Sequence, residues 1–172
     1  MGHAEIVGKT VKRRDNFKQG FFKPANTDKY RGKLPIFFRS SWELAFCSFC
    51  DKHSGVLQWG IESVVVDYID ETPLLETPKG APRSRRYFVD FFMTIAKAGG
   101  GKETLLVEIK PWHETVPPKP RPRQNPDAWH RERCKWMRNL AKWRAATEAA
   151  KRRGWRFQIM TERQLALPRK RK

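Results

Sequence analysis

The residues best suited to chemistry in this 172-residue sequence are two carboxylates and a lysine, Asp90, Glu108 and Lys110. If Asp90 meets Glu108 across neighbouring strands, the two charges repel each other, and burial adds to the cost of ionising both. Such a pair persists when it shares a proton or holds a divalent cation, and Mg²⁺ favours one or two carboxylates with waters and phosphate oxygens. The adjacent ammonium could orient a water and neutralise charge on a phosphate, which indicates phosphodiester hydrolysis.

A glycine-rich turn would bring these residues together. Two β-rich runs between Arg85 and Lys110 flank Ala98-Gly99-Gly100-Gly101, which is typical of a hairpin loop. Centring the hairpin near Gly99 places Asp90 opposite Glu108. The same register predicts six further pairs: Val89 with Ile109, Phe91 with Val107, Met93 with Leu105, Phe88 with Lys110, Phe92 with Leu106, and Thr94 with Thr104. The first three pairs are apolar and share one face, and a slip of one residue would mix the two faces.

The same residues have an ordinary structural explanation. A carboxylate two residues before a lysine is common on strands that face solvent, so Asp90 and Glu108 could be polar residues of an edge strand. The pattern alone leaves both interpretations open.

The elements before the hairpin can be placed from caps and periodicity. Ser40 followed three residues later by Glu43 is a capping box, which predicts a helix from there to about Lys52. Its apolar stripe would be Trp42, Ala45, Phe46 and Phe49. Residues 56–68 are strand-like, and residues 70–84, with three prolines and a glycine, predict a loop.

A proline-rich basic linker, 111–126, follows the hairpin, and then a long helix is expected from Pro126 to Arg153. Its apolar face would be Trp129, Trp136, Leu140, Trp143 and Ala150, and this stripe favours a core position over a base-stacking platform. Gly154 is suited to end the helix, and residues 155–160 predict a last strand.

This order of elements predicts an α/β fold with a small mixed sheet flanked by helices. The length suits a single domain. We expect a basic N-terminal arm over residues 1–36, a folded domain over 37–165 and a basic tail over 166–172. No apolar run is long enough to cross a membrane, so no membrane partner is expected.

Charge is distributed unevenly along the chain, whose formal net charge is +18. Residues 1–39 carry ten Lys and Arg against three Asp and Glu, residues 40–118 carry eight against eleven, and residues 119–172 carry eighteen against four. An acidic centre between basic ends predicts ends that bind nucleic-acid phosphates. A basic tail that serves solubility or RNA contact is the alternative.

Two segments carry a family resemblance, Tyr87-Phe88-Val89-Asp90-Phe91 and Leu106-Val107-Glu108-Ile109-Lys110-Pro111. With the glycine-rich turn between them they resemble the PD-(D/E)xK nuclease signature. The sequence from about residue 20 to about residue 165 is similar to the head completion nucleases of T4-like tailed bacteriophages, and more distantly to the TnsA-type transposon endonucleases. The likeness extends to Phe38-Arg39-Ser40-Ser41-Trp42-Glu43, Trp59, Glu62, Arg86, Asn139, Ala141-Lys142-Trp143, Ala149, Gly154-Trp155 and Ile159-Met160-Thr161-Glu162.

The resemblance implies a restriction-endonuclease-like fold and Mg²⁺-dependent cleavage of DNA, with Mn²⁺ as an alternative ion. Asp90, Glu108 and the backbone carbonyl of Ile109 would then bind the metal, and Lys110 would be the catalytic lysine. Glu43 would be an additional catalytic carboxylate, although the capping box explains it equally well. Val89 stands where the motif has proline, a position that shapes the backbone rather than binding metal.

Other polar residues are weaker candidates. Basic and amide side chains expected to contact DNA are Arg39, Arg86, Lys135, Arg138, Asn139 and Lys142. Glu62 and His113 are further site candidates, and for each the alternative is an ordinary exposed position. Cys47 with Cys50, and His130 with Cys134, could bind zinc, but both pairs fall on expected helices, where a buried free cysteine is usually a small apolar residue.

The resemblance further implies that this is a nuclease acting on packaged DNA ends before the neck and tail join the phage head. Its partners would be DNA and head, portal or neck proteins, without a small-molecule cofactor, and its location the host cytoplasm during assembly, or the virion. Two alternatives stay open: a non-catalytic protein that binds DNA ends at the head–neck junction, and an endonuclease subunit of a transposition complex. A decayed nuclease would be expected to have lost Asp90, Glu108 or Lys110, and all three are present.

Overall fold

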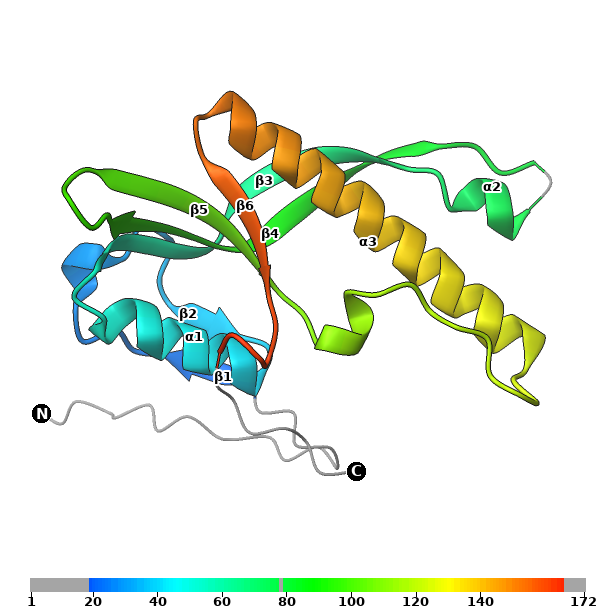
Figure 1. The fold of residues 1–172 in the computed structure, drawn as a ribbon, viewed down its shortest axis with the longest axis horizontal. Coiled ribbons are helices and arrows are strands. Elements are labelled where there is room, and N and C mark those ends of the chain that lie inside the picture. The colour runs from blue at the N-terminus through cyan, green and yellow to red at the C-terminus, as the bar shows by residue number, and fades with distance from the viewer. Residues whose placement is uncertain (1–18, 78, 166–172) are drawn as a thin grey trace, which may run out of the picture.

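The computed structural model describes residues 19–77 and 79–165, which form a mixed α/β fold (Figure 1). Its central sheet has four strands in the order β3 (Val56–Asp70), β4 (Arg83–Ala96), β5 (Lys102–Ile109) and β6 (Arg156–Met160). The first three strands are antiparallel to their neighbours, and β6 is parallel to β5. The predicted α/β class with a mixed sheet is confirmed.

Helices cover both faces of this sheet. The helices are α1 (Ser41–Lys52), α2 (Pro73–Glu76) and α3 (Pro126–Arg152), with short 3-10 turns η1 (Thr27–Lys29) and η2 (Trp112–Glu114). One core cluster joins α1 to alternate residues of β5, including Leu105 and Val107, and a second joins α3 to Leu106 on the other side. Helix α1 therefore packs on one face and α3 on the opposite face, as Figure 1 shows. In the described part of the chain, no helix is both long and apolar enough to span a membrane.

The capping box predicted at the start of α1 is present. The Ser40 hydroxyl oxygen accepts a hydrogen bond from the Glu43 backbone N–H at 3.1 Å, and the Glu43 carboxylate reaches back to the Arg39 N–H at 2.7 Å. This arrangement satisfies N–H groups that the first turn of a helix leaves free. It orients α1 so that Phe46, which is almost fully buried, meets the Phe91 ring of β4 edge-on.

The predicted hairpin register is confirmed over its central part. Phe91 pairs with Val107, Phe92 with Leu106, Met93 with Leu105, and Thr94 with Thr104. The ladder ends at Phe91 and Val107, so the expected pairs of Asp90 with Glu108, Val89 with Ile109, and Phe88 with Lys110 lie where the strands have already separated. The predicted placement of Val89 beside Phe91 and Met93 is wrong, because Val89 packs in the cluster under α3.

A bulge in β3 lies beside this change of face. Ile61 pairs with Phe91 and Val64 with Val89, so two residues of β3, Glu62 and Ser63, stand opposite Asp90 alone. Glu62 has a φ of 46°, a left-handed conformation that non-glycine residues seldom adopt. Bulges redirect the side chains of a sheet. Asp90 is thus flanked by a bulge on one side and by the opened hairpin on the other.

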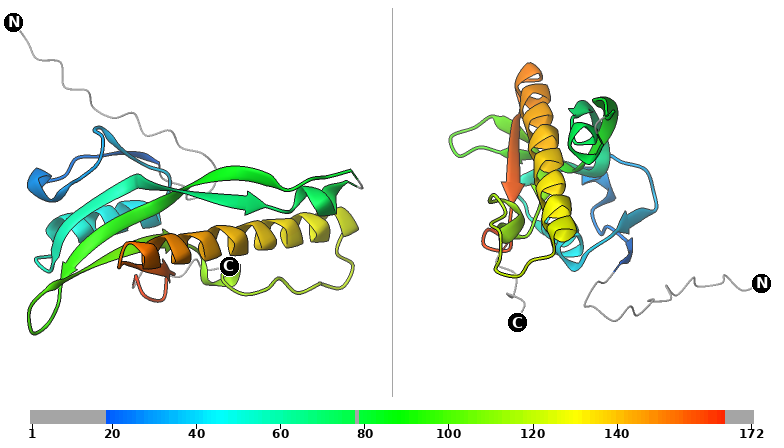
Figure 2. Two further views of the ribbon diagram at one scale, coloured as in Figure 1. Left: turned by 90° about the horizontal axis from the view of Figure 1, so that it is seen from above. Right: turned by 90° about the vertical axis from the view of Figure 1, so that its right-hand side faces the viewer.

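Helix α3 packs on the sheet through only part of its length. Its buried apolar residues near the sheet are Trp143, Ala146, Ala149 and Ala150, whose small size lets the helix approach closely. The predicted stripe is wrong toward the N-terminus, where Leu140 is 38% exposed and Trp136 only half-buried. There α3 runs beside the far ends of β3 and β4, beyond the rest of the sheet (Figure 2).

Two other predicted boundaries differ from the structure. The arm expected over residues 1–36 is partly folded, because β1 (Gly20–Phe22) pairs with β2 (Ile36–Phe38), and Tyr30 and Ile36 are buried in the core. The centres of the Tyr30 and Trp59 rings lie 4.8 Å apart in an edge-to-face arrangement, a contact between distant segments that composition could not reveal. The expected loop over 70–84 contains α2 and the ends of both strands. Residues 1–18 of the arm and the tail at 166–172 lie outside the described residues.

Candidate active site

Asp90, Glu108 and Lys110 come together at the open end of the hairpin. The Ile109 N–H donates a hydrogen bond to Asp90 Oδ2 at 2.8 Å, which ties the Asp90 side chain to β5. Lys110 Nζ lies 3.0 Å from Glu108 Oε1. Glu108 is only 3% exposed, whereas the Lys110 side chain is 25% exposed. The three residues that sequence reasoning selected therefore form one cluster that is open to solvent on the lysine side.

A buried tyrosine holds Glu108 from the opposite direction. The Tyr87 hydroxyl donates to Glu108 Oε2 at 2.5 Å, so the lysine and the tyrosine engage different oxygens of one carboxylate. Burial and the negative charge of Glu108 both raise the pKa of Tyr87, which keeps the hydroxyl protonated and able to donate. Glu108 is thereby fixed in orientation before any ligand arrives.

The surroundings of Asp90 disfavour its charged form. Burial, followed by repulsion from Glu108, raises the pKa of Asp90 well above its ordinary value, despite the hydrogen bond from Ile109. Burial disfavours the Lys110 ammonium, but attraction to Glu108 and Asp90 outweighs it and raises the lysine pKa. One ammonium is therefore held in place, and the carboxylate beside it is incompletely compensated.

The donor set suits a hard divalent cation. Asp90 and Glu108 offer only carboxylate oxygens, which is the chemistry of Mg²⁺ rather than of zinc. Within residues 19–77 and 79–165, no three His, Cys, Asp or Glu side chains gather into a metal-binding group. A cation held here would thus take two carboxylates at most and complete its shell with backbone oxygen, water and phosphate, as Mg²⁺ commonly does.

Glu43 and Glu62 are engaged elsewhere. The Glu43 carboxylate contacts the Ser40 hydroxyl at 3.1 Å and the Arg39 N–H, as its capping role requires. Its negative charge still reaches Asp90 and adds a small contribution to the raised pKa there, after burial and Glu108. Glu62 forms an ion pair with Arg39. These contacts connect the start of α1 to the β3 bulge, and so support the site from outside.

A basic cavity adjoins the cluster along the free edge of β4. It has a volume of about 530 Å³ and is lined by Tyr68, Arg85, Arg86, Phe88, Arg138 and Lys142. Lys142 Nζ lies 5.5 Å from the centre of the Tyr87 ring, and burial lowers the Lys142 pKa. Arg86 lies 5.7 Å from the centre of the Phe88 ring. Three of the predicted DNA-contacting residues, Arg86, Arg138 and Lys142, therefore line one cavity next to Tyr87 and Glu108.

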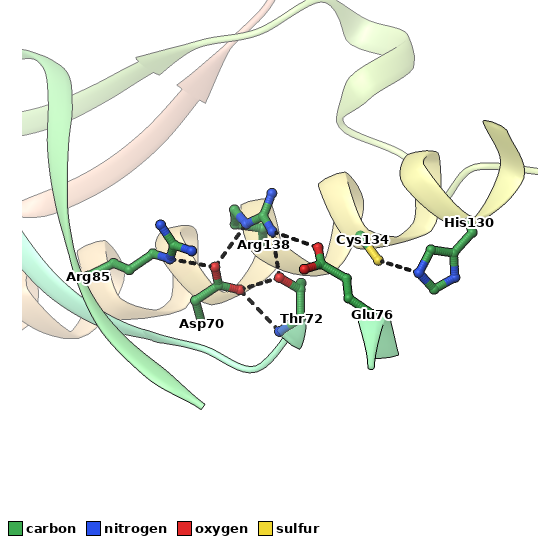
Figure 3. Close-up of polar contacts among 7 residues, drawn as sticks. All are labelled: Asp70, Thr72, Glu76, Arg85, His130, Cys134 and Arg138. Atoms are coloured by element: carbon green, nitrogen blue, oxygen red, sulfur yellow. Dashed lines mark hydrogen bonds and ion pairs between the residues drawn. The ribbon is translucent and has the colours of Figure 1, made fainter. Parts of the chain in front are cut away.

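Arg138 shares this cavity but is bound to a buried acid (Figure 3). Its Nε lies 3.0 Å from Asp70 Oδ2, and its guanidinium also reaches the Thr72 hydroxyl at 2.6 Å. Arg85 Nε contacts the same Asp70 oxygen at 2.7 Å. Arg138 therefore links α3 to the far end of the β3–β4 ribbon, which is a structural duty that sequence reasoning had not anticipated.

The remaining predicted residues lie around a different cavity, between η2, the linker and α3. Lys135 Nζ contacts Glu114 Oε1 at 2.7 Å, and His113 and Asn139 line the same space. Arg39, in contrast, lies on the far side of the bulge with Glu62. The structure thus divides the predicted DNA contacts among three places rather than gathering them in one groove.

The cysteines behave as apolar or weakly polar groups. Cys47 and Cys50 are fully buried in α1, and burial raises the pKa of Cys47 to about 12. Cys134 lies 3.4 Å from the His130 ring on α3, far along the chain from the first pair. Because the described residues hold no group of three metal-binding side chains, they offer no zinc site.

Sequence reasoning missed Tyr87 as part of the site. Strand alternation puts Tyr87 and Asp90 on opposite faces, yet beside the β3 bulge Tyr87 contacts Glu108 and Asp90 contacts the neighbouring Ile109 N–H. Tyr68 was missed as well, and its ring lies 5.9 Å from Lys142 Nζ. No local pattern signals either contact, because each depends on residues distant in sequence.

Comparison with known proteins identifies relatives of this chain. Residues 53–162, which include β3 to β6 and all three clustered residues, match the family model described as TnsA-like endonuclease N terminal. The chain is 36% identical over 147 residues to the head completion nuclease of Enterobacteria phage T4, an alignment that covers 83% of this chain and 90% of that protein. No solved structure matches.

Proposed function

Because the chain belongs to the TnsA-like endonuclease family, whose fold is restriction-endonuclease-like, we propose that it is a Mg²⁺-dependent deoxyribonuclease with its centre at Asp90, Glu108 and Lys110. The predicted relationship to head completion and TnsA-type nucleases is confirmed. One observation carries the proposal: two carboxylates meet at the open end of the hairpin, with the ammonium of Lys110 3.0 Å from one of them. That arrangement is costly unless it performs a function.

Each residue has a distinct role in the proposed reaction. Asp90 and Glu108 would hold the divalent cation, and the Ile109 carbonyl is the candidate third protein ligand. Bound Mg²⁺ would polarise the scissile phosphate and increase the acidity of the attacking water. The raised pKa of Lys110 favours its ammonium form, which suits this side chain to orient water and to neutralise charge on the phosphate.

Two neighbours support this centre without touching the reacting atoms. Tyr87 fixes the Glu108 carboxylate through its 2.5 Å hydrogen bond, which limits the motion of a metal ligand. Glu43 acts through its charge on Asp90 and through the start of α1, rather than as a ligand. Both are positioning residues.

DNA would approach from the side where Lys110 is exposed. Lys142 and Arg86 line the cavity beside Tyr87, where they can meet phosphates on one side of the cleavage point. The basic excess outside residues 40–118 supplies further attraction that is independent of sequence. Binding should therefore weaken steeply as salt increases.

We propose phage head completion as the biological setting, because the T4 relative is named a head completion nuclease and the likeness spans most of both chains. The substrate would be packaged DNA ends, processed before neck and tail join, in the host cytoplasm during assembly. Head, portal or neck proteins would be its protein partners.

A cleavage assay tests the proposed centre. Linear and nicked DNA are incubated with the protein in Mg²⁺, Mn²⁺ or EDTA, beside Asp90→Asn and Lys110→Ala. We expect EDTA to abolish cutting and each substitution to reduce its rate at least about 100-fold, with salt-sensitive binding retained. Asp67→Asn and Lys97→Ala, which change exposed residues of the same types, are the matched controls and should cut normally.

Equal cutting by Asp90→Asn and Asp67→Asn would remove the assigned centre. No cutting by the parent protein with any divalent ion would favour a DNA-end-binding structural protein instead.

A further inference from the structure

A cavity of about 400 Å³ lies between α3 and the segment after β5. It is lined by His113, Glu114, Val116, Pro118, Lys119, Arg121, Glu132, Lys135, Trp136 and Asn139. This volume is in the range of pockets that hold small molecules. None of the residues of the proposed catalytic centre lines it, so the centre does not explain it.

Its walls are held in place by ion pairs between the linker and the helix. Lys135 contacts Glu114 at 2.7 Å, and Arg121 pairs with Glu132. The Arg121 N–H also donates to Gln124 Oε1 at 3.0 Å, which closes the turn before α3. These contacts join the two segments of the chain that line the cavity.

The lining combines an aromatic ring, an amide and positive charge. Trp136 is only half-buried although it lies on the face expected to enter the core, because α3 has left the sheet at this point. Asn139 is 8% exposed, and its amide forms no side-chain hydrogen bond to any residue within 19–77 and 79–165. Lys119 likewise has no ion pair within those ranges. A stacking surface, a base-edge reader and a phosphate partner are the parts of a nucleotide site.

The cavity is close to the catalytic centre. His113 and Glu114 follow Lys110 in the chain after Pro111 and Trp112, and the negative charge of Glu114 contributes to the raised pKa of Lys110. Asn139 is one helical turn before Lys142, whose Nζ lies 5.5 Å from the centre of the Tyr87 ring, and Tyr87 donates to Glu108. A DNA strand whose phosphate lies at Lys110 can therefore place a neighbouring nucleotide in this space.

We propose that this cavity binds one unpaired nucleotide next to the cleaved phosphate, so that the preferred substrate is DNA with an unpaired end. The inference rests on the proposed nuclease function and names the substrate class of that site. A base inside a duplex is stacked on both faces and cannot leave the stack for a side cavity, whereas an overhang or frayed end presents a free base. Trp136 would stack on that base, Asn139 would contact its edge, and Lys119 would meet its phosphate.

A binding experiment without cleavage tests this proposal. Asp90→Asn protein in EDTA is titrated into a blunt duplex, and into duplexes with 5′ or 3′ overhangs that carry 2-aminopurine at each unpaired position in turn. Stacking of one base on an aromatic side chain corresponds to roughly tenfold in affinity. We expect one overhang polarity to bind about tenfold more tightly than the blunt duplex, with a change of 2-aminopurine fluorescence at one position.

Variants then assign that preference to the cavity. Trp136→Ala in the same background should remove the overhang preference and the fluorescence change while leaving blunt-duplex binding intact. Leu140→Ala, an exposed apolar residue one turn further along α3, is the matched control and should keep both. Asn139→Leu, which keeps the volume but removes the amide, is the second variant and should also reduce the preference.

Equal affinity of the Asp90→Asn protein for blunt and overhanging DNA would overturn the proposal. So would a Trp136→Ala variant that loses affinity for the blunt and the overhanging duplex to the same extent. Retention of the overhang preference by both Asn139→Leu and Trp136→Ala would also overturn it. A parent protein that cuts nothing but whose cavity still selects overhangs would remove the nuclease and keep the nucleotide site. Cutting without any overhang preference would keep the nuclease function and remove the nucleotide site.

Discussion

Two acids of the β3–β4 ribbon lie in opposite electrostatic environments. Asp70, at the end of β3, is fully buried and receives the Thr72 N–H and hydroxyl, Arg85 and Arg138. Burial opposes its ionisation, but these partners outweigh burial and lower its pKa. Asp90, in β4, receives one backbone N–H and faces Glu108, and its pKa is raised.

The difference separates a structural carboxylate from a functional one. Around Asp70 the protein supplies two guanidinium groups from two different elements, so the charge is matched and the acid ties α3 to the ribbon. Around Asp90 the protein leaves negative charge incompletely balanced, which is the condition for attracting a cation. The number of partners, rather than burial, distinguishes the two acids.

The largest expected effect on stability comes from breaking the Asp70 cluster, which consists of Asp70, Thr72, Arg85 and Arg138. Asp70→Asn removes the charge shared by Arg85 and Arg138, and we expect it to destabilise the fold by about 2 kcal/mol. A broken buried ion pair usually costs about 3–5 kcal/mol, reduced here because both arginines are partly exposed. Urea unfolding followed by circular dichroism measures the loss. The exposed Asp67→Asn serves as control, and equal stabilities of the two variants would contradict the structural role.

Acid titration sharpens the comparison. The pKa of Asp70 is lowered in the folded state from an ordinary value of 3.8, so its contribution is fully present above that value and is lost as pH falls through the folded pKa. We therefore expect the stability difference between the parent and Asp70→Asn to be constant near neutral pH and to shrink below about pH 4. Unfolding free energies at a series of pH values measure this. A difference that grows on acidification would contradict the assignment.

The contrast between these acids was only partly predictable from sequence. The glycine turn and alternating apolar residues specify the hairpin, so the meeting of Asp90 with Glu108 and Lys110 could be predicted. The Asp70 cluster could not, because Arg138 is distant in the chain and stands on a helix whose angle to the ribbon depends on the whole fold. Asp70 was accordingly assigned to a loop.

Contacts between residues that are distant in sequence also explain the other differences between prediction and structure. Tyr87 contacts Glu108 near the bulge in β3, and no residue pattern in β4 signals that contact. The N-terminal segment contributes Tyr30 to the core through contact with Trp59, a long-range pairing between aromatic residues. Local patterns specified the elements that are continuous in sequence, whereas contacts between distant segments specified the surroundings of the site.

The smallest expected effect concerns the stability of Asp90→Asn, the variant that should be catalytically impaired. Asn retains an oxygen that can accept the Ile109 N–H, but it removes the repulsion with Glu108. Because the Asp90 pKa is raised in the folded state, its ionisation costs stability as pH rises above the ordinary value. Its loss should therefore leave stability unchanged or increase it by about 1 kcal/mol at neutral pH, as substitutions of strained functional residues often do.

Urea unfolding of Asp90→Asn and the parent in EDTA at two pH values measures this gain. The gain in unfolding free energy should be larger near pH 8 than near pH 5. The difference expected for Asp70→Asn, in contrast, is constant over this range. Adding Mg²⁺ should then stabilise the parent more than the variant, because a cation bound to the folded state adds to its free energy of unfolding. If Asp90→Asn instead destabilised the fold as strongly as Asp70→Asn, both acids would be structural, and the cation would have to be held elsewhere.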